Sequence, residues 1–235
     1  MKKREKKVYT TPEGLKHGAS ASFSTASFLW IINLIWQYAI AFLQPSGWFS
    51  LIFTLIGFGL LLAAAIIAYN AFDTEIQADA IASETLDKTL PKLKKLVMAC
   101  IIIRFLLTPL ALFNTGLIRP QSVALYTDID ALINILGNLF TTVNIFCIFT
   151  YKIYVTDGHD GKVRIYALLA IIFSVARILL TELRYGLQLV DKISIPLSYA
   201  ATLTAVISYF AFFLMFEARK VLYKPTAKPE EEQQQ

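Results

Sequence analysis

The sequence predicts an all-α fold: a polytopic bundle of six transmembrane helices with both termini in the cytoplasm. Three observations lead to this prediction. The 235 residues are 56% hydrophobic and only 17% charged, which is too apolar for an ordinary soluble domain. Apolar residues form six blocks, each about as long as the ~20 residues that a helix needs to cross ~30 Å of hydrocarbon. Lysine and arginine cluster in alternate connections between these blocks.

The six spans are expected to be helices, because an open sheet in lipid leaves its backbone unsatisfied. In chain order they lie at about 24–43, 48–68, 96–117, 131–151, 165–183 and 195–216. The first span follows a basic segment, 1–23, but it is too long and too far from the N-terminus for a cleavable signal peptide. The C-terminal tail, 218–235, is expected to be disordered, because it is polar and lacks aromatic residues from Lys224 onward.

The first two spans are joined by a short Gln-Pro-Ser-Gly turn at 44–47. The second span is almost wholly apolar, so we expect it to face lipid at the periphery of the bundle. The connection 70–95 that follows it allows two interpretations: a surface helix that docks a partner or senses lipid, or a solvated linker. Its weak amphipathic pattern and mixed charges favour the linker.

The remaining spans carry polar residues on single faces. In the fourth span, Asp130, Asn134 and Asn138 recur at every fourth residue, which places them on one face of a helix. The fifth span does the same with Arg177 and Thr181. With the polar residues of the first, third and sixth spans, these stripes predict a shared polar interior that is lined by every span except the second.

The positive charges give the bundle a direction. Most of the 22 lysines and arginines lie in the N-terminal segment, the 70–95 connection, the connection after the fourth span and the C-terminal tail. The opposite connections hold only Arg119, Arg184 and Lys192. Because positive residues near helix ends stay on the cytoplasmic side during insertion, both termini are expected to be cytoplasmic.

Two arginines lie inside the spans, where helical rise places Arg104 about 12 Å and Arg177 about 18 Å into the bilayer. A cation at this depth indicates a wet cavity or an anionic ligand. The alternative is that the polar groups of the interior only join helices through hydrogen bonds. The candidate ligand-binding residues are Arg104, Thr108, Asn134, Asn138, Arg177 and Thr181.

The acidic residues near the spans lie at the outer boundary of the bilayer. Asp128, Asp130 and Glu182 are expected to form ion pairs there, with Arg184 among the cations. Because these acids lie at the boundary, fewer carboxylates than arginines are expected at mid-depth. The side chain of Arg177 is nevertheless expected to reach toward Asp130.

The sequences around the two arginines resemble each other. The heptapeptides that begin at Arg104 and Arg177 agree at five of seven positions, following the pattern Arg-x-Leu-Leu-Thr-x-Leu. Both spans are expected to run from inside to outside, so the similarity fits a two-helix unit duplicated in parallel orientation. Chance similarity between two leucine-rich spans is the alternative.

No motif of an enzyme, a metal site or a cofactor site occurs in the sequence. The two histidines, His17 and His159, lie outside the spans, and Cys100 and Cys147 lie inside them with no histidine nearby. The repeated Asp-Gly pair at 157–161 indicates a turn, and a metal loop is the less favoured interpretation. We therefore expect no catalytic residue, no metal, no cofactor and, for lack of a basic domain, no nucleic-acid partner.

Two functions fit these expectations. The first is a transporter, channel or ligand-binding protein whose cationic interior attracts an anionic or lipid-like ligand. The second is a non-catalytic scaffold or accessory subunit of a larger membrane complex. Its basic segments would contact anionic lipid at the cytoplasmic face or a partner protein. Small residues such as Gly59 and Ala63 would let helices pack closely, including those of a homo-oligomer.

Overall fold

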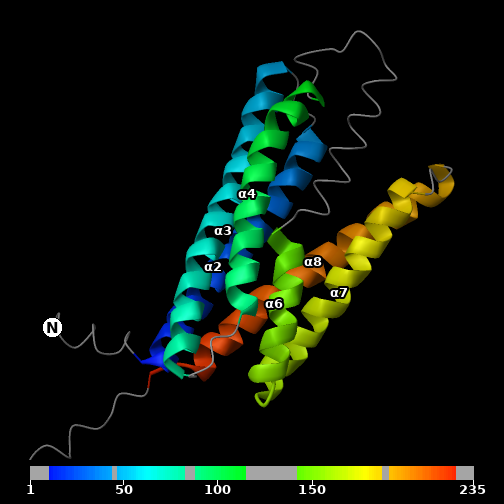
Figure 1. The fold of residues 1–235 in the computed structure, drawn as a ribbon. Helices are drawn as coiled ribbons and strands as arrows, with labels where there is room; N and C mark the ends of the chain where they lie inside the picture. The colour runs from blue at the N-terminus through cyan, green and yellow to red at the C-terminus, as the bar shows by residue number, and fades with distance from the viewer. Residues whose placement is uncertain (1–10, 44–46, 83–87, 115–141, 187–190, 226–235) are drawn as a thin grey trace, which may run out of the picture.

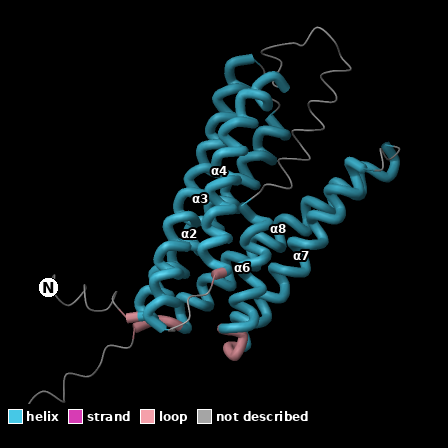
Figure 2. Tube along the Cα trace, in the orientation of Figure 1, coloured by secondary structure: helices cyan, strands magenta, loops and turns pink. Residues whose placement is uncertain are grey.

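The computed structural model describes residues 11–43, 47–82, 88–114, 142–186 and 191–225. Over these residues the chain forms six helices and no strand, so the predicted all-α fold is confirmed. The helices are α2 (Pro12–Leu43), α3 (Gly47–Ala82), α4 (Thr89–Asn114), α6 (Thr142–Thr156), α7 (Gly161–Gly186) and α8 (Asp191–Leu222). Figure 2 shows how little of the described chain lies outside these helices.

Four of the described helices are long and apolar enough to cross a membrane. The stretches that meet this condition are Pro12–Ile40, Trp48–Ala82, Gly161–Thr181 and Tyr199–Leu222. Large apolar side chains such as Phe49, Ile66 and Leu203 are exposed on them, as expected for a surface that contacts lipid. The apolar helices therefore support a membrane-embedded protein, while the count of six spans and their direction stay predictions.

The helices form two groups that converge at one end (Figure 1). Helices α2, α3 and α4 run side by side, and α7 and α8 form a hairpin that leans away from them. Helix α6, described from Thr142, lies between the groups near the convergent end, where it contacts α4 and α7. Because α2 also packs against α8, the two groups form one bundle at this end.

Aromatic side chains from four helices form the core near the convergent end. Phe23 of α2 lies at the centre, with its ring centroid 5.0 to 5.4 Å from the rings of Phe72, Phe146, Phe149 and Phe216. All five side chains are fully buried. Each such ring pair contributes about 0.5–1.5 kcal/mol beyond the burial of its apolar area. The core therefore holds α2, α3, α6 and α8 together.

A buried group of charges lies one helical turn beyond the aromatic core. The guanidinium of Arg219, only 2% exposed, binds the carboxylates of both Glu75 and Asp157. Its Nε donates to Asp157 at 2.6 Å, and its Nη1 donates to Glu75 at 2.9 Å and to the Ser20 hydroxyl at 3.3 Å. The Tyr223 hydroxyl donates to the second oxygen of Asp157 at 2.6 Å. We call these five residues the Arg219 cluster; they join α2, α3, α8 and the α6–α7 turn.

Helix α3 is longer than the sequence predicted. It continues through Ala68, the expected end of the second span, to Ala82. The described part of the 70–95 connection is thus neither a solvated linker nor a separate surface helix. Its Phe72 and Glu75 are buried in the aromatic core and the Arg219 cluster. These contacts are made by residues far apart in the sequence, which is why local composition did not indicate them.

Two further acids on this part of α3 pair with neighbouring helices. Asp73 binds Lys94 of α4, whose ammonium also lies 4.4 Å from the ring centroid of Tyr69. Asp79 binds Lys152 of α6 at 2.6 Å. The C-terminal part of α3 therefore contacts α4, α6 and α8 through three different acids, and it is the centre of the charged end of the bundle.

The Asp-Gly repeat forms the turn between α6 and α7, as predicted. The backbone N–H of Asp157 donates to the carbonyl of Ile153 at 2.8 Å, which continues α6 into the turn. The Asp160 carboxylate then accepts from the backbone N–H groups of Lys162 and Val163 at 2.9 and 3.0 Å. This is the N-cap arrangement that begins a helix, so each aspartate has a structural role.

Candidate functional site

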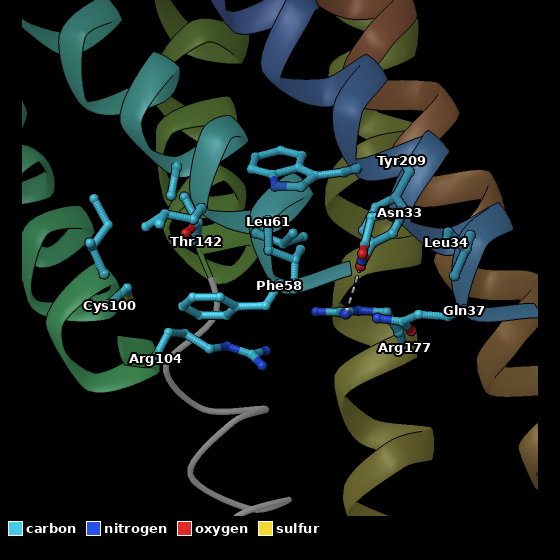
Figure 3. A pocket seen from close by; sticks show the side chains of 15 residues that line it. Asn33, Leu34, Gln37, Phe58, Leu61, Cys100, Arg104, Thr142, Arg177 and Tyr209 are labelled. Atoms are coloured by element: carbon cyan, nitrogen blue, oxygen red, sulfur yellow. Dashed lines mark hydrogen bonds between the residues drawn. The ribbon is translucent and has the colours of Figure 1, made fainter. Parts of the chain in front are cut away.

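A cavity of about 170 Å³ lies inside the bundle, between the two groups of helices (Figure 3). A cavity of this size takes several water molecules or a small ligand, since one water occupies about 30 Å³ of liquid. All six described helices contribute to its wall. Its lining residues are Trp30, Asn33, Leu34, Gln37, Phe58, Leu61, Leu62, Ala65, Cys100, Ile101, Arg104, Thr142, Val143, Arg177 and Tyr209.

Arg177 lies on one side of the cavity and is held by neutral groups. Its Nη2 donates to the side-chain oxygen of Asn144 at 3.2 Å, and its Nη1 donates to the Tyr209 hydroxyl at 3.4 Å. The guanidinium carbon lies 5.9 Å from the Tyr209 ring centroid. Within the described residues Arg177 has no carboxylate partner, and its buried Nε has no hydrogen-bond partner. Its charge is therefore oriented by the fold without being neutralised by these neighbours.

Arg104 enters the same cavity from α4. Figure 3 shows its guanidinium and that of Arg177 reaching into the cavity from opposite sides, at a similar level. The two arginines that the sequence singled out are thus brought together in one cavity.

Asn33 and Gln37 of α2, both polar residues of the expected interior, also line the cavity. Asn33 is 5% exposed, and its side-chain oxygen has no hydrogen-bond partner in the part of the chain that the structure describes. Leaving a buried acceptor unsatisfied costs about 1–3 kcal/mol. This oxygen faces α3, where a Cβ added at Gly57 would lie 3.4 Å from it.

Helix α3 provides the apolar wall, which corrects the expectation that it lies only at the lipid-facing periphery. Its Phe58, Leu61 and Leu62 line the cavity. The helix also packs closely on α2 at Gly57, where an added Cβ would lie 3.3 Å from Trp36. An apolar helix that lines a cavity and one that only faces lipid have the same composition, so sequence could not distinguish them. At Gly59, expected at a close-packing face, an added Cβ would meet no atom within 4 Å.

The other predicted site residues fall into three groups. The Thr181 hydroxyl donates to the backbone carbonyl of Arg177 at 2.8 Å, so this side chain bonds within its own helix. Thr108 lies on α4, and Glu182 and Arg184 lie on α7, but their side chains are outside the described residues. The last group also lies outside the described residues and consists of Asp128, Asp130, Asn134 and Asn138.

Sequence reasoning missed the Arg219 cluster, because Arg219 was counted with the charges of the tail and Glu75 with those of the connection. Spacing could have revealed it. Phe212, Phe216 and Arg219 are separated by four and three residues, which places the arginine on the buried face of α8. Glu75 follows the buried Phe72 by one turn in the same way.

The Arg219 cluster shifts the pKa values of its outer members. Burial by itself raises the pKa of Asp157, but the Arg219 guanidinium and the Tyr223 hydroxyl outweigh burial and hold that pKa below its ordinary value. Burial and the hydrogen bond to Asp157 raise the pKa of Tyr223. Asp157 is therefore ionised and Tyr223 protonated at neutral pH, as the hydrogen bond between them requires.

Among the described residues, no three histidine, cysteine, aspartate or glutamate side chains lie close enough together to hold a metal ion. Both cysteines are free thiols, and Cys100 is buried in the cavity wall one turn before Arg104. No protein-family model, curated protein or solved structure matches the chain. The function is therefore argued from the cavity and its two arginines.

Proposed function

We propose that the protein is a multi-pass membrane protein that binds an anionic or lipid-like ligand in the cavity and acts as a transporter, channel or ligand-binding protein. The observation that carries this proposal is the surroundings of Arg177, whose described partners are an amide and a phenol. A cation in a membrane interior is costly unless something compensates its charge. An anion between Arg177 and Arg104 provides that compensation.

The membrane setting is part of the proposal. Four apolar helices have the length and composition of spans. The apolar block in α4 and the block at 131–151 complete the proposed six. The basic residues at both termini support a cytoplasmic location of both termini, near anionic lipid. The charged end of the bundle would then lie at the cytoplasmic side.

The chemistry of the cavity suits recognition and not catalysis. Hydrogen bonds from a guanidinium to an anion are roughly twice as strong as neutral ones, and low polarity around them strengthens the attraction further. The apolar wall of α3 offers contact to a ligand's hydrocarbon part.

The experiment compares the wild type with a variant in which Arg104 and Arg177 are both replaced by glutamine. The purified chain is incubated with phosphatidylcholine vesicles that contain either phosphatidylglycerol or oleate, and retained molecules are identified by native mass spectrometry. Arg164→Gln is the control, because Arg164 is exposed at the start of α7 and lies over the ring of Tyr154 outside the cavity. The wild type and the control are expected to retain an anionic amphiphile that the double variant loses. Equal retention by all three proteins would contradict the proposal.

The second candidate is a non-catalytic scaffold or accessory subunit, and the Arg219 cluster together with the aromatic core favours it. These groups join four segments through contacts inside the chain, as a rigid structural subunit requires. In this case the basic segments bind a partner protein, a second copy of the chain or anionic lipid at the cytoplasmic face. Purification from mild detergent in a stable complex is the expected result, and recovery of the bare monomeric chain would contradict it.

A further inference from the structure

We propose that the ligand binds through a phosphate group held between Arg104 and Arg177. This inference rests on the proposed function and names the chemistry of the ligand that the cavity recognises. The phosphate belongs either to a membrane lipid or to a free phosphate compound, since both present the same group to the arginines.

The first argument is the number and placement of the donors. Each guanidinium is a planar fork of N–H groups that matches two oxygens of an anion. A carboxylate has two oxygens in one plane, so two forks have to share the same pair of oxygens. A phosphate has oxygens in a tetrahedral arrangement, so it can meet one fork from α4 and another from α7 at the same time. The two arginines reach into the cavity from opposite sides, as Figure 3 shows, which suits the tetrahedral group.

The second argument is that the hydrogen-bonding groups of Arg177 are only partly used. Its Nε is without a partner among the described residues, while Asn144 and Tyr209 hold its two terminal nitrogens. Tyr209 accepts a hydrogen bond from Arg177 through its oxygen, so its own O–H remains a donor. Each terminal nitrogen of Arg177 carries a second N–H group, and these groups together with the Tyr209 hydroxyl offer donors to phosphate oxygens on the α7–α8 side of the cavity.

The experiment measures the affinity of the full chain for three probes. They are inorganic phosphate, phosphatidic acid in phosphatidylcholine nanodiscs, and oleate in the same nanodiscs. Each probe is measured with the wild type, with Arg177→Lys, with Tyr209→Phe and with the double variant in which Arg104 and Arg177 are glutamine. Arg177→Lys keeps the charge but removes the fork, and Tyr209→Phe removes one donor with little change in shape. We expect phosphatidic acid or inorganic phosphate to bind at least tenfold more tightly than oleate. We also expect Arg177→Lys to weaken that binding about tenfold and Tyr209→Phe to weaken it several-fold.

The outcomes distinguish this inference from the proposed anion site, and they distinguish a lipid ligand from a free phosphate compound. Preference for phosphatidic acid supports a lipid ligand, and preference for inorganic phosphate supports a free phosphate compound. Oleate binding as tightly as either phosphate probe would overturn this inference and leave the proposed anion site standing. Binding of all three probes that is unchanged in Arg177→Lys and in the double glutamine variant would overturn both. Thermal unfolding midpoints of the unliganded proteins verify that each variant is folded.

Discussion

Two arginines with opposite surroundings define the molecule at the scale of residues. Arg219 is buried against two carboxylates, whereas Arg177 has an amide and a phenol as its described partners. A buried charge with full compensation holds a structure together, and one without it in a cavity is available to a ligand. The same residue type therefore has a structural role at the charged end and a proposed binding role in the bundle interior.

Replacing Arg219 by methionine is expected to destabilise the protein severely. The change leaves the carboxylates of Glu75 and Asp157 buried without their cation, and breaking such a pair costs about 3–5 kcal/mol. Lys220→Met is the matched control, because Lys220 is 37% exposed and pairs with Glu217 only at the surface. Its expected cost is below about 1 kcal/mol. Thermal or denaturant unfolding in detergent measures both, and equal costs for the two variants would contradict the structural role of Arg219.

The lowered pKa of Asp157 predicts a pH dependence of stability. Because this pKa lies below that of the unfolded chain, the contribution of Asp157 is fully present above about pH 5 and is lost as pH falls through the folded-state pKa. The unfolding midpoint of the wild type is expected to fall between about pH 5 and pH 3. Asp157→Asn lowers the midpoint at neutral pH and makes this fall shallower. A slope below pH 5 that is the same in both proteins would show that Asp157 does not contribute.

Sequence identified Arg104 and Arg177 because a charge within an apolar block is conspicuous. It did not identify Arg219, because a cation at the end of an apolar block next to a basic tail has the appearance of a residue at the membrane boundary. The partner that keeps Arg219 buried, Glu75, is 144 residues away in the chain. Such a pairing depends on tertiary structure, which composition and local spacing do not contain.

At the scale of elements, the sequence predicted the α6–α7 turn but not the end of α3. The Asp-Gly repeat predicted the turn through local chemistry, and the structure adds the N-cap role of Asp160. The end of α3 was placed too early, because the charges after Ala68 suggested departure from the membrane. These charges are instead satisfied by α4, α6 and α8.

The turn provides a prediction with a matched control. A Cβ on Gly158 would collide with the backbone carbonyl of Tyr154, whereas a Cβ on Gly161 meets no atom within 4 Å. Gly158→Ala must therefore move backbone, which displaces Asp157 from Arg219 and lowers the unfolding midpoint. Gly161→Ala is expected to leave the midpoint nearly unchanged. The two variants are compared by thermal unfolding in detergent. A Gly158→Ala variant as stable as the wild type would contradict the close contact between residue 158 and the Tyr154 carbonyl.

At the scale of the whole molecule, hydropathy predicted that helices form but not which helices meet. Short connections leave several arrangements open, and only the fold shows that α4 and α7 place their arginines in one cavity. Of the residues expected in the polar interior, Asn33 and Gln37 of α2, Arg104 of α4 and Arg177 of α7 line the cavity. The contribution of α3 was missed because its share of the wall is apolar.

The direction of the bundle across the membrane is tested by labelling. Figure 1 shows the α6–α7 turn and the end of α8 at the same end of the molecule, and both His159 and Lys224 are exposed. In a background with Cys100→Ser and Cys147→Ser, the variants His159→Cys and Lys224→Cys are treated with an impermeant maleimide. Both are expected to react only when the cytoplasmic side is accessible, in agreement with the positive-inside rule. Reaction from the other side, or from different sides in the two variants, would contradict the proposed topology.

The central claim is that Arg104 and Arg177 hold a ligand and do not serve only to join helices. The most direct measurement is a cryo-electron microscopy map of the full chain in lipid nanodiscs, with a bound antibody fragment to provide mass. The account predicts density for a bound anion between the two guanidiniums, which disappears in the Arg104→Gln and Arg177→Gln double variant. A side-chain carboxylate of this chain between the two arginines, with no other density in the cavity, would contradict it.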